Sequence, residues 1–102
     1  MHINFVRTGG FAGIHLTFNI ETDFAPKQEA AKLEKMVSDS GFFDLGKVIK
    51  PPVPSPDRFE YQVNISSAGK THSIVVGEPV IPDNLRPLLD YLTILALVKK
   101  NL

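Results

Sequence analysis

Residues 14–20 read Ile-His-Leu-Thr-Phe-Asn-Ile and place an apolar side chain at every second position. This period of two is typical of a β-strand that has one face on a core and the other in water. The stretch therefore predicts an antiparallel sheet, and the other elements can be placed around it.

Two further stretches flank this strand on its N-terminal side. Residues 2–7 (HINFVR) predict a short strand with Ile3 and Phe5 on one face. Residues 8–13 (TGGFAG) contain three glycines, which adopt positive φ at little cost. The glycine-rich stretch is therefore expected to join the two strands as a hairpin connection.

The next segments predict a helix and then an irregular stretch. Residues 26–40 (PKQEAAKLEKMVSDS) carry apolar residues at helical spacing, with Pro26 suited to the first turn and Gly41 to the C-terminal cap. Phe42, Phe43 and Leu45 are expected to tuck under the sheet edge. Residues 46–57 contain four prolines, which disfavour helix and sheet ladder, so this stretch is expected to be extended and stiff.

A second hairpin and a last helix complete the chain. Residues 59–65 and 71–76 alternate like the first pair, and residues 67–70 (SAGK) predict the turn between them. Residues 83–99 predict a leucine-rich helix capped by Asp83 or Asn84. Its apolar face is wide, so this helix is either deeply sandwiched in the core or in contact with a partner.

The order β-β-α-β-β-α predicts an α+β fold with a four-stranded, mostly antiparallel sheet in two hairpins and two helices on one face. The 102 residues are 43% hydrophobic and 22% charged, which fits one domain over residues 1–102. If the first strand runs up, the loops at 8–13, 51–57 and 77–82 all lie at the top. A crossing of the sheet by residues 41–50 would reverse this placement.

Composition and motifs exclude several function classes. Acidic and basic residues balance at 11 each without a clustered basic face, which argues against nucleic acid. The start of the chain does not look like a secretory signal, and the apolar run at 85–98 is too short and too polar to span a membrane, so a cytoplasmic monomer is expected. No cysteine, no metal-binding histidine spacing and no GxSxG motif occur, so we expect neither an enzyme nor a cofactor.

Three segments of this sequence resemble the emfourin family. They are residues 7–14 (RTGGFAGI), residues 57–61 (Asp-Arg-Phe-Glu-Tyr) and residues 82–89 (PDNLRPLL), and the resemblance extends over essentially the whole chain. Emfourins are small bacterial protein inhibitors of thermolysin-family zinc metalloproteases, with protealysin-like enzymes as natural targets. The resemblance implies two adjacent loops: one directs an aspartate at the zinc of the protease, and the other fills its substrate subsites with apolar side chains.

Carried onto this sequence, the resemblance implies that Asp57 is the ligand to the partner's zinc. Asp23, at the opposite end of the expected sheet, is the second choice, and Asp83 borders the third upper loop. The implied protease-binding residues are Gly9, Gly10, Phe11, Ala12, Gly13, Ile14, Pro54, Ser55, Pro56 and Asp57.

Each of these features also has a structural explanation. The glycines can serve the turn alone, Phe11 can fold back into the core, and Asp57 can make an Asx-type turn that starts a strand. Two other functions also stay open. One is a non-inhibitory interaction module that uses the apolar C-terminal helix, and the other is a small enzyme or ligand-binding domain that uses the upper loops.

Overall fold

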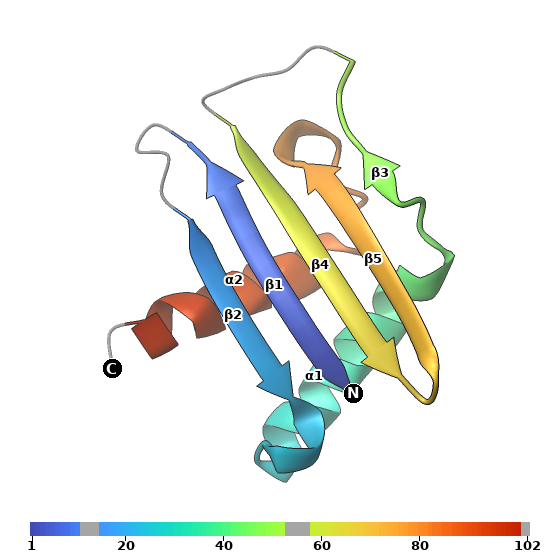
Figure 1. The fold of residues 1–102 in the computed structure, drawn as a ribbon, viewed down its shortest axis with the longest axis vertical. Helices are drawn as coiled ribbons and strands as arrows, with labels where there is room; N and C mark the ends of the chain where they lie inside the picture. The colour runs from blue at the N-terminus through green and yellow to red at the C-terminus, as the bar shows by residue number, and fades with distance from the viewer. Residues whose placement is uncertain (11–14, 53–57, 101–102) are drawn as a thin grey trace.

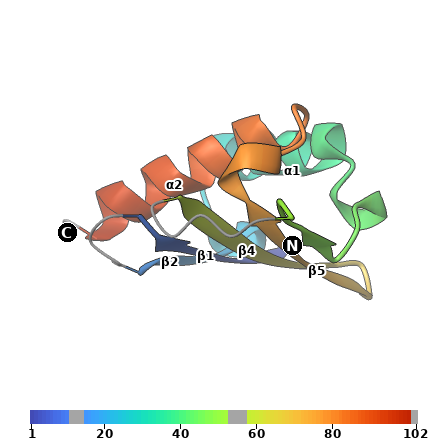
Figure 2. The same cartoon turned by 90° about the horizontal axis from the view of Figure 1, so that it is seen from above.

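The computed structural model describes residues 1–10, 15–52 and 58–100. Within these ranges the chain forms a five-stranded sheet in the order β2-β1-β4-β5-β3, and two α-helices cover one of its faces (Figure 1 and Figure 2). None of the helices in these ranges has the length and apolar character needed to cross a membrane. The elements are β1 (His2–Gly9), β2 (Leu16–Glu21), α1 (Lys27–Ser40), β3 (Val48–Ile49), β4 (Phe59–Ser67), β5 (Lys70–Gly77) and α2 (Arg86–Lys100), with 3-10 turns η1 (Thr22–Phe24), η2 (Phe42–Asp44) and η3 (Glu78–Val80).

The two predicted hairpin pairs are confirmed. β1 pairs antiparallel with β2, and β4 pairs antiparallel with β5, in registers that bring apolar positions together on the helix side. The turn after β4 uses Ala68 and Gly69, both at positive φ, at the predicted place. The buried hydrophobic residues of the sheet are Ile3, Phe5, Leu16, Phe18, Tyr61, Val63, Ile65, Ile74 and Val76.

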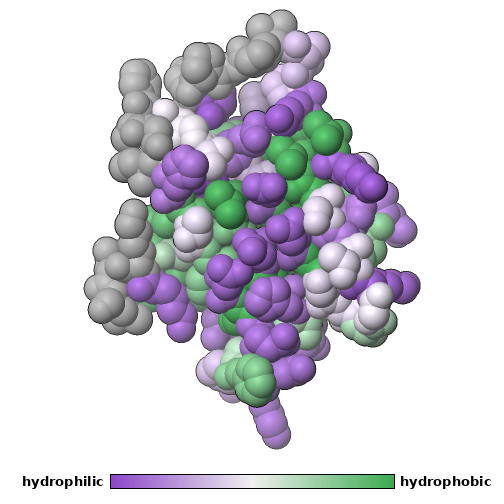
Figure 3. Space-filling model, viewed as in Figure 1, coloured by the Kyte–Doolittle hydropathy of each residue, from purple (hydrophilic) through white to green (hydrophobic). Residues whose placement is uncertain are grey.

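The opposite face of the sheet is polar. Asn19, Asn4, Asn64 and Ser73 stand in register as one row across four strands. Hydrophilic side chains dominate this face in Figure 3. The alternation read in the sequence therefore separates a helix-covered face from a face in water.

α1 follows the sequence signals closely, whereas α2 begins later than predicted. α1 begins after Pro26 and ends at Gly41, which adopts the left-handed conformation at φ 64°. α2 begins at Arg86, so the predicted start at residue 83 and the predicted cap by Asp83 or Asn84 are wrong. The reason is a turn at residues 82–86, in which the Pro82 carbonyl accepts hydrogen bonds from the N–H groups of Leu85 and Arg86.

A fifth strand corrects the predicted four-stranded sheet. Val48 and Ile49 pair parallel with Val75 and Val76, and the Val75 N–H donates to the Lys47 carbonyl at 2.8 Å. Two residues are too short for a period of two to be visible, and the prolines that follow favour an irregular stretch. β3 forms because the chain passes the free edge of β5, which offers unpaired backbone groups.

The apolar segment that follows α1, residues 42–45, packs under the sheet edge as predicted. Phe42 is buried, and the Phe42 and Phe43 rings meet edge to face with centroids 5.6 Å apart. His72 Nε2 lies 2.8 Å from the Leu45 carbonyl oxygen, which ties this segment to β5. The segment thus closes the edge of the core without crossing the sheet.

Candidate functional site

The two predicted loops start from neighbouring points on the sheet. β1 and β4 are antiparallel partners, and their register pairs Gly9, at the end of β1, with Phe59, at the start of β4. β5 ends at the same end of the sheet, since Gly77 pairs with Glu60. Figure 1 shows these three strand ends together. β3 runs parallel to β5, so it leaves the predicted placement of the loop ends unchanged, and that placement is confirmed at the described stems.

Gly9 and Gly10 are required by their surroundings as well as by their backbone conformation. Gly9 has φ 95°, and a Cβ atom there would collide with the Arg58 carbonyl oxygen. Gly10 has φ 76°, and a Cβ atom would lie 2.7 Å from the Phe59 ring. The Gly10 N–H donates to the Arg58 carbonyl at 3.3 Å. A larger residue at either position would push the two loop stems apart.

The Phe59 ring also contacts a cation. The guanidinium carbon of Arg7 lies 4.1 Å from the centroid of the ring, a distance at which the charge is attracted to the aromatic face. Arg7 is on the core side of β1, and its buried Nε has no hydrogen-bond partner among the described residues. Its position over Phe59 therefore depends on packing and on charge.

Glu78, the first residue of η3, connects the third segment. Its Oε1 accepts a hydrogen bond from the Phe59 N–H at 3.4 Å and lies 3.8 Å from Nη1 of Arg58. Glu78 is less exposed than Arg58, with 29% against 56% of the side chain accessible, so the carboxylate is the fixed partner of the pair. We call Arg7, Gly9, Gly10, Arg58, Phe59 and Glu78 the loop platform.

Tyr61 lies directly below the loop platform in the core. Its pKa is raised, chiefly because burial disfavours the phenolate, while the nearby Arg7 guanidinium opposes the shift and the Glu78 carboxylate adds to it. The Tyr61 ring also packs on Phe5, with centroids 6.0 Å apart. The phenol therefore stays neutral at physiological pH and serves as a support for the charged groups above it.

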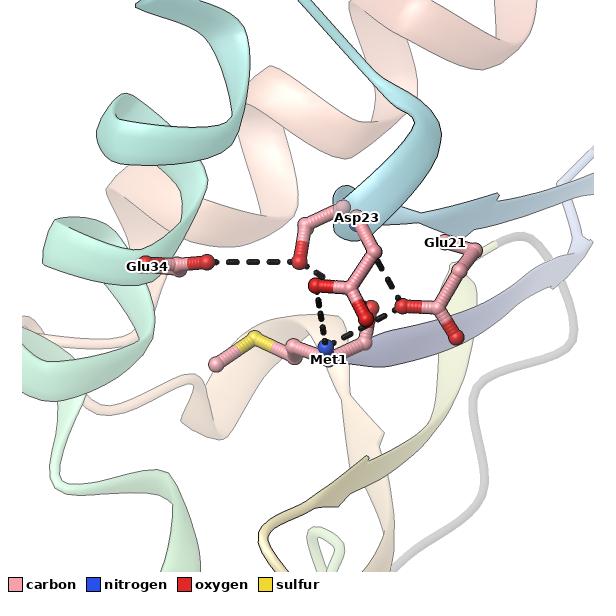
Figure 4. Close-up of polar contacts among 5 residues, drawn as sticks. Met1, Glu21, Asp23 and Glu34 are labelled. Atoms are coloured by element: carbon pink, nitrogen blue, oxygen red, sulfur yellow. Dashed lines mark hydrogen bonds and ion pairs between the residues drawn. The ribbon is translucent and has the colours of Figure 1, made fainter. Parts of the chain in front are cut away.

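A different arrangement holds the opposite end of the sheet. The Met1 amino group donates to Glu21 at 3.1 Å and lies 4.0 Å from an Asp23 oxygen, while the Thr22 hydroxyl contacts the Met1 carbonyl and Glu34 (Figure 4). The hydrogen bond to Glu21 raises the pKa of the Met1 amine, and the same bond lowers the pKa of Glu21. Asp23, the second-choice zinc ligand, thus lies at the far end from the loop stems, as expected.

Most of the predicted binding residues fall outside the described ranges. They are Phe11, Ala12, Gly13, Ile14, Pro54, Ser55, Pro56 and Asp57. Their roles stay predictions, whereas Gly9 and Gly10 are described and belong to the loop platform. Asp83 is exposed and lies between η3 and α2.

Part of the loop platform has no signal in the sequence. Glu78 cannot be recognised there, because a single glutamate in a loop has no pattern around it. Phe59 belongs to the alternating stretch 59–65, which indicates a strand. The contact of its ring with Gly10 has no sequence signal, because it depends on β1 and β4 being neighbours.

The described part of the chain contains no candidate metal-binding site. No group of three histidine, aspartate or glutamate side chains there could hold an ion. An apolar hollow of about 320 Å³ lies between α1 and η2 and is lined by residues that include Met1, Val37 and Phe42. This hollow is at the Met1 end of the sheet, away from the loop stems.

Comparison with known protein families gives one finding that covers most of the chain. The family model named Emfourin matches residues 5–93, which includes the whole loop platform. No curated protein and no solved structure gives a significant match. Since the match spans far more than half of the sequence, this chain belongs to the emfourin family.

Proposed function

We propose that this protein inhibits a thermolysin-like zinc metalloprotease by inserting two loops, residues 10–15 and 51–58, into the active-site cleft. Membership of the emfourin family supports a role as a protease inhibitor and not as an enzyme. The observation that carries the proposal is the contact between the two loop stems. Gly9 pairs with Phe59, and the Gly10 N–H donates to the Arg58 carbonyl, so both stems lie at one end of the sheet.

Asp57 is the residue that we assign to the zinc. A catalytic zinc keeps one coordination position for water or substrate, and a carboxylate oxygen in that position displaces the nucleophilic water. Asp57 lies one residue before Arg58, whose carbonyl is hydrogen-bonded to β1 through Gly10. Asp57 is therefore the chain neighbour of a residue whose backbone is held to the sheet.

Phe11 is the apolar anchor in this proposal. It follows Gly10 directly, so it is as close in sequence to the loop platform as Asp57 is. Burial of a phenylalanine side chain in an apolar subsite contributes about 1.5–3 kcal/mol. The prolines at 51, 52, 54 and 56 restrict the other loop and lower the entropic cost of binding.

Inhibition of a thermolysin-like protease by point variants tests the assignment. Asp57→Ala and Phe11→Ala are each expected to raise the inhibition constant by about tenfold or more, because each removes one contact of about 1.5 kcal/mol or more. The thermal midpoint should change little. Asp83→Ala, a carboxylate removed near the same edge, serves as the control and should inhibit like the parent protein. If both loop variants inhibit as well as the parent does, the assignment of these residues is wrong.

The outer face of α2 favours a second candidate function. Ile94, Leu97 and Val98 are 55%, 44% and 54% exposed, so the helix is not sandwiched on this side. An apolar face of this kind suits a protein-interaction module without a protease target. Self-association in sizing chromatography that is lost in Leu97→Lys would support this function, whereas a monomer that inhibits a metalloprotease would exclude it.

A further inference from the structure

We propose that Glu78 is a positioning residue for inhibition, because its carboxylate holds a peptide group that connects the stems of both loops. The proposal rests on the proposed function, in which the two loops enter the protease together. It concerns a residue of η3, outside both loops, and gives this third segment a part in inhibition.

The peptide group between Arg58 and Phe59 is held from both sides. On the β1 side, its carbonyl oxygen accepts the Gly10 N–H at 3.3 Å. On the β5 side, its N–H donates to Glu78 Oε1 at 3.4 Å. Hydrogen bonds to the two ends of one peptide group polarise each other, so the loss of one weakens the other.

The Glu78 carboxylate takes the place of a missing strand residue. The ladder between β4 and β5 ends at the pair Glu60–Gly77, so the Phe59 N–H lies one step beyond the last pair. A side-chain oxygen from the following turn supplies the acceptor that the strand no longer offers. Its negative charge also faces the Arg58 guanidinium at 3.8 Å, which favours the same position.

One loop ends and the other begins next to this peptide group. Asp57 precedes Arg58 in the chain, and Phe11 follows Gly10, whose N–H is bonded to the Arg58 carbonyl. The Phe59 ring adds a second connection, since it lies against Gly10 and below the Arg7 guanidinium. A shift at Glu78 therefore reaches the stems of both loops.

Two substitutions at Glu78 separate its roles. Glu78→Gln keeps an oxygen acceptor for the Phe59 N–H but removes the charge, whereas Glu78→Ala removes both. Since loss of a hydrogen bond to a charged group costs about one factor of ten, Glu78→Ala should weaken inhibition by about tenfold. Glu78→Gln should restore most of it. Glu60→Ala is the matched control, because the Glu60 carboxylate lies at the same end of the sheet and pairs with Lys50 at 3.2 Å.

Amide hydrogen exchange of the free protein supplies a readout that does not depend on a protease. In Glu78→Ala the exchange of the Gly10 amide should become faster, as well as that of Phe59, because the shared peptide group is released. In Glu78→Gln and Glu60→Ala the Gly10 amide should exchange as in the parent. Faster exchange at Phe59 alone would overturn the proposed coupling, as would full inhibition by Glu78→Ala.

The two proposals fail in different ways. A parent protein that leaves thermolysin-like proteases active overturns the proposed function and the role of Glu78 in it. An unchanged Gly10 amide in Glu78→Ala overturns the coupling alone, even if the parent protein inhibits.

Discussion

The two ends of the sheet are held by different chemistry. At the loop stems, Gly9 and Gly10 pack closely on the Arg58 carbonyl and the Phe59 ring, a contact to which charged side chains add. At the other end, the Met1 amine is held by the carboxylates of Glu21 and Asp23. Close packing on glycine fixes positions at any pH and salt concentration, whereas the contribution of an ion pair depends on both. The end that carries the proposed inhibitory loops is thus the geometrically constrained one.

The largest expected effect comes from breaking the packed end. Gly9→Ala is predicted to destabilise the protein by about 2–3 kcal/mol, because the added Cβ collides with the Arg58 carbonyl and strains a residue at positive φ. Gly46→Ala is the matched control, since nothing lies near a Cβ there, and it should change stability by less than about 0.5 kcal/mol. Urea unfolding measures both. Equal effects of the two substitutions would contradict the assigned packing.

A smaller effect is expected when the cation above Phe59 is removed. Arg7→Ala should destabilise the protein by about 1 kcal/mol and weaken inhibition, because the ring loses the group that holds it against Gly10. Lys32→Ala offers a comparison, since its ammonium lies 4.4 Å from the Tyr91 ring on the helices. That variant should inhibit normally, and parallel losses of inhibition in both would show that the effect is not specific to the loop stems.

The smallest effect concerns pH and belongs to the charged end. The pKa of Glu21 is lowered from 4.5, so its contribution to stability is present above that pH and is lost as the pH falls through its folded-state value. The pKa of the Met1 amine is raised from 8.0, so its contribution is present below pH 8.0 and is lost as the pH rises through the folded-state value. The Glu21→Gln variant should therefore melt below the parent near pH 6 and approach it at both extremes.

Thermal midpoints of both proteins across this pH range check the prediction. The difference should also shrink in high salt, because the pair is partly accessible to solvent. A difference that is constant from low to high pH would show that Glu21 acts through packing and not through its charge.

Local periodicity made most of the fold predictable. The alternation at 14–20 correctly indicated a strand with Leu16 and Phe18 in the core, and Gly41 correctly marked the end of α1. β3 was not predictable, because a two-residue strand has no period and exists only through the edge of β5. The start of α2 was misplaced because the turn closed by the Pro82 carbonyl looks like a helix start in sequence.

The candidate site was predictable only in its placement. The alternating directions of the strands predict that the segment after Gly10 and the segment before Arg58 lie at the same end of the sheet. The contacts that hold them there were not visible, because Arg7, Phe59 and Glu78 are far apart in sequence and share no motif. Long-range side-chain packing of this kind depends on which strands are neighbours, and the alternation within each strand does not specify that β1 lies beside β4.

Competition for the zinc site tests the central claim most directly. Calorimetric titration of the protein into a thermolysin-like protease should show one-to-one binding, and a saturating small hydroxamate that occupies the zinc should abolish it. The account predicts this mutual exclusion because the Asp57 carboxylate and the hydroxamate need the same coordination position. Undiminished binding in the presence of the hydroxamate would contradict the account.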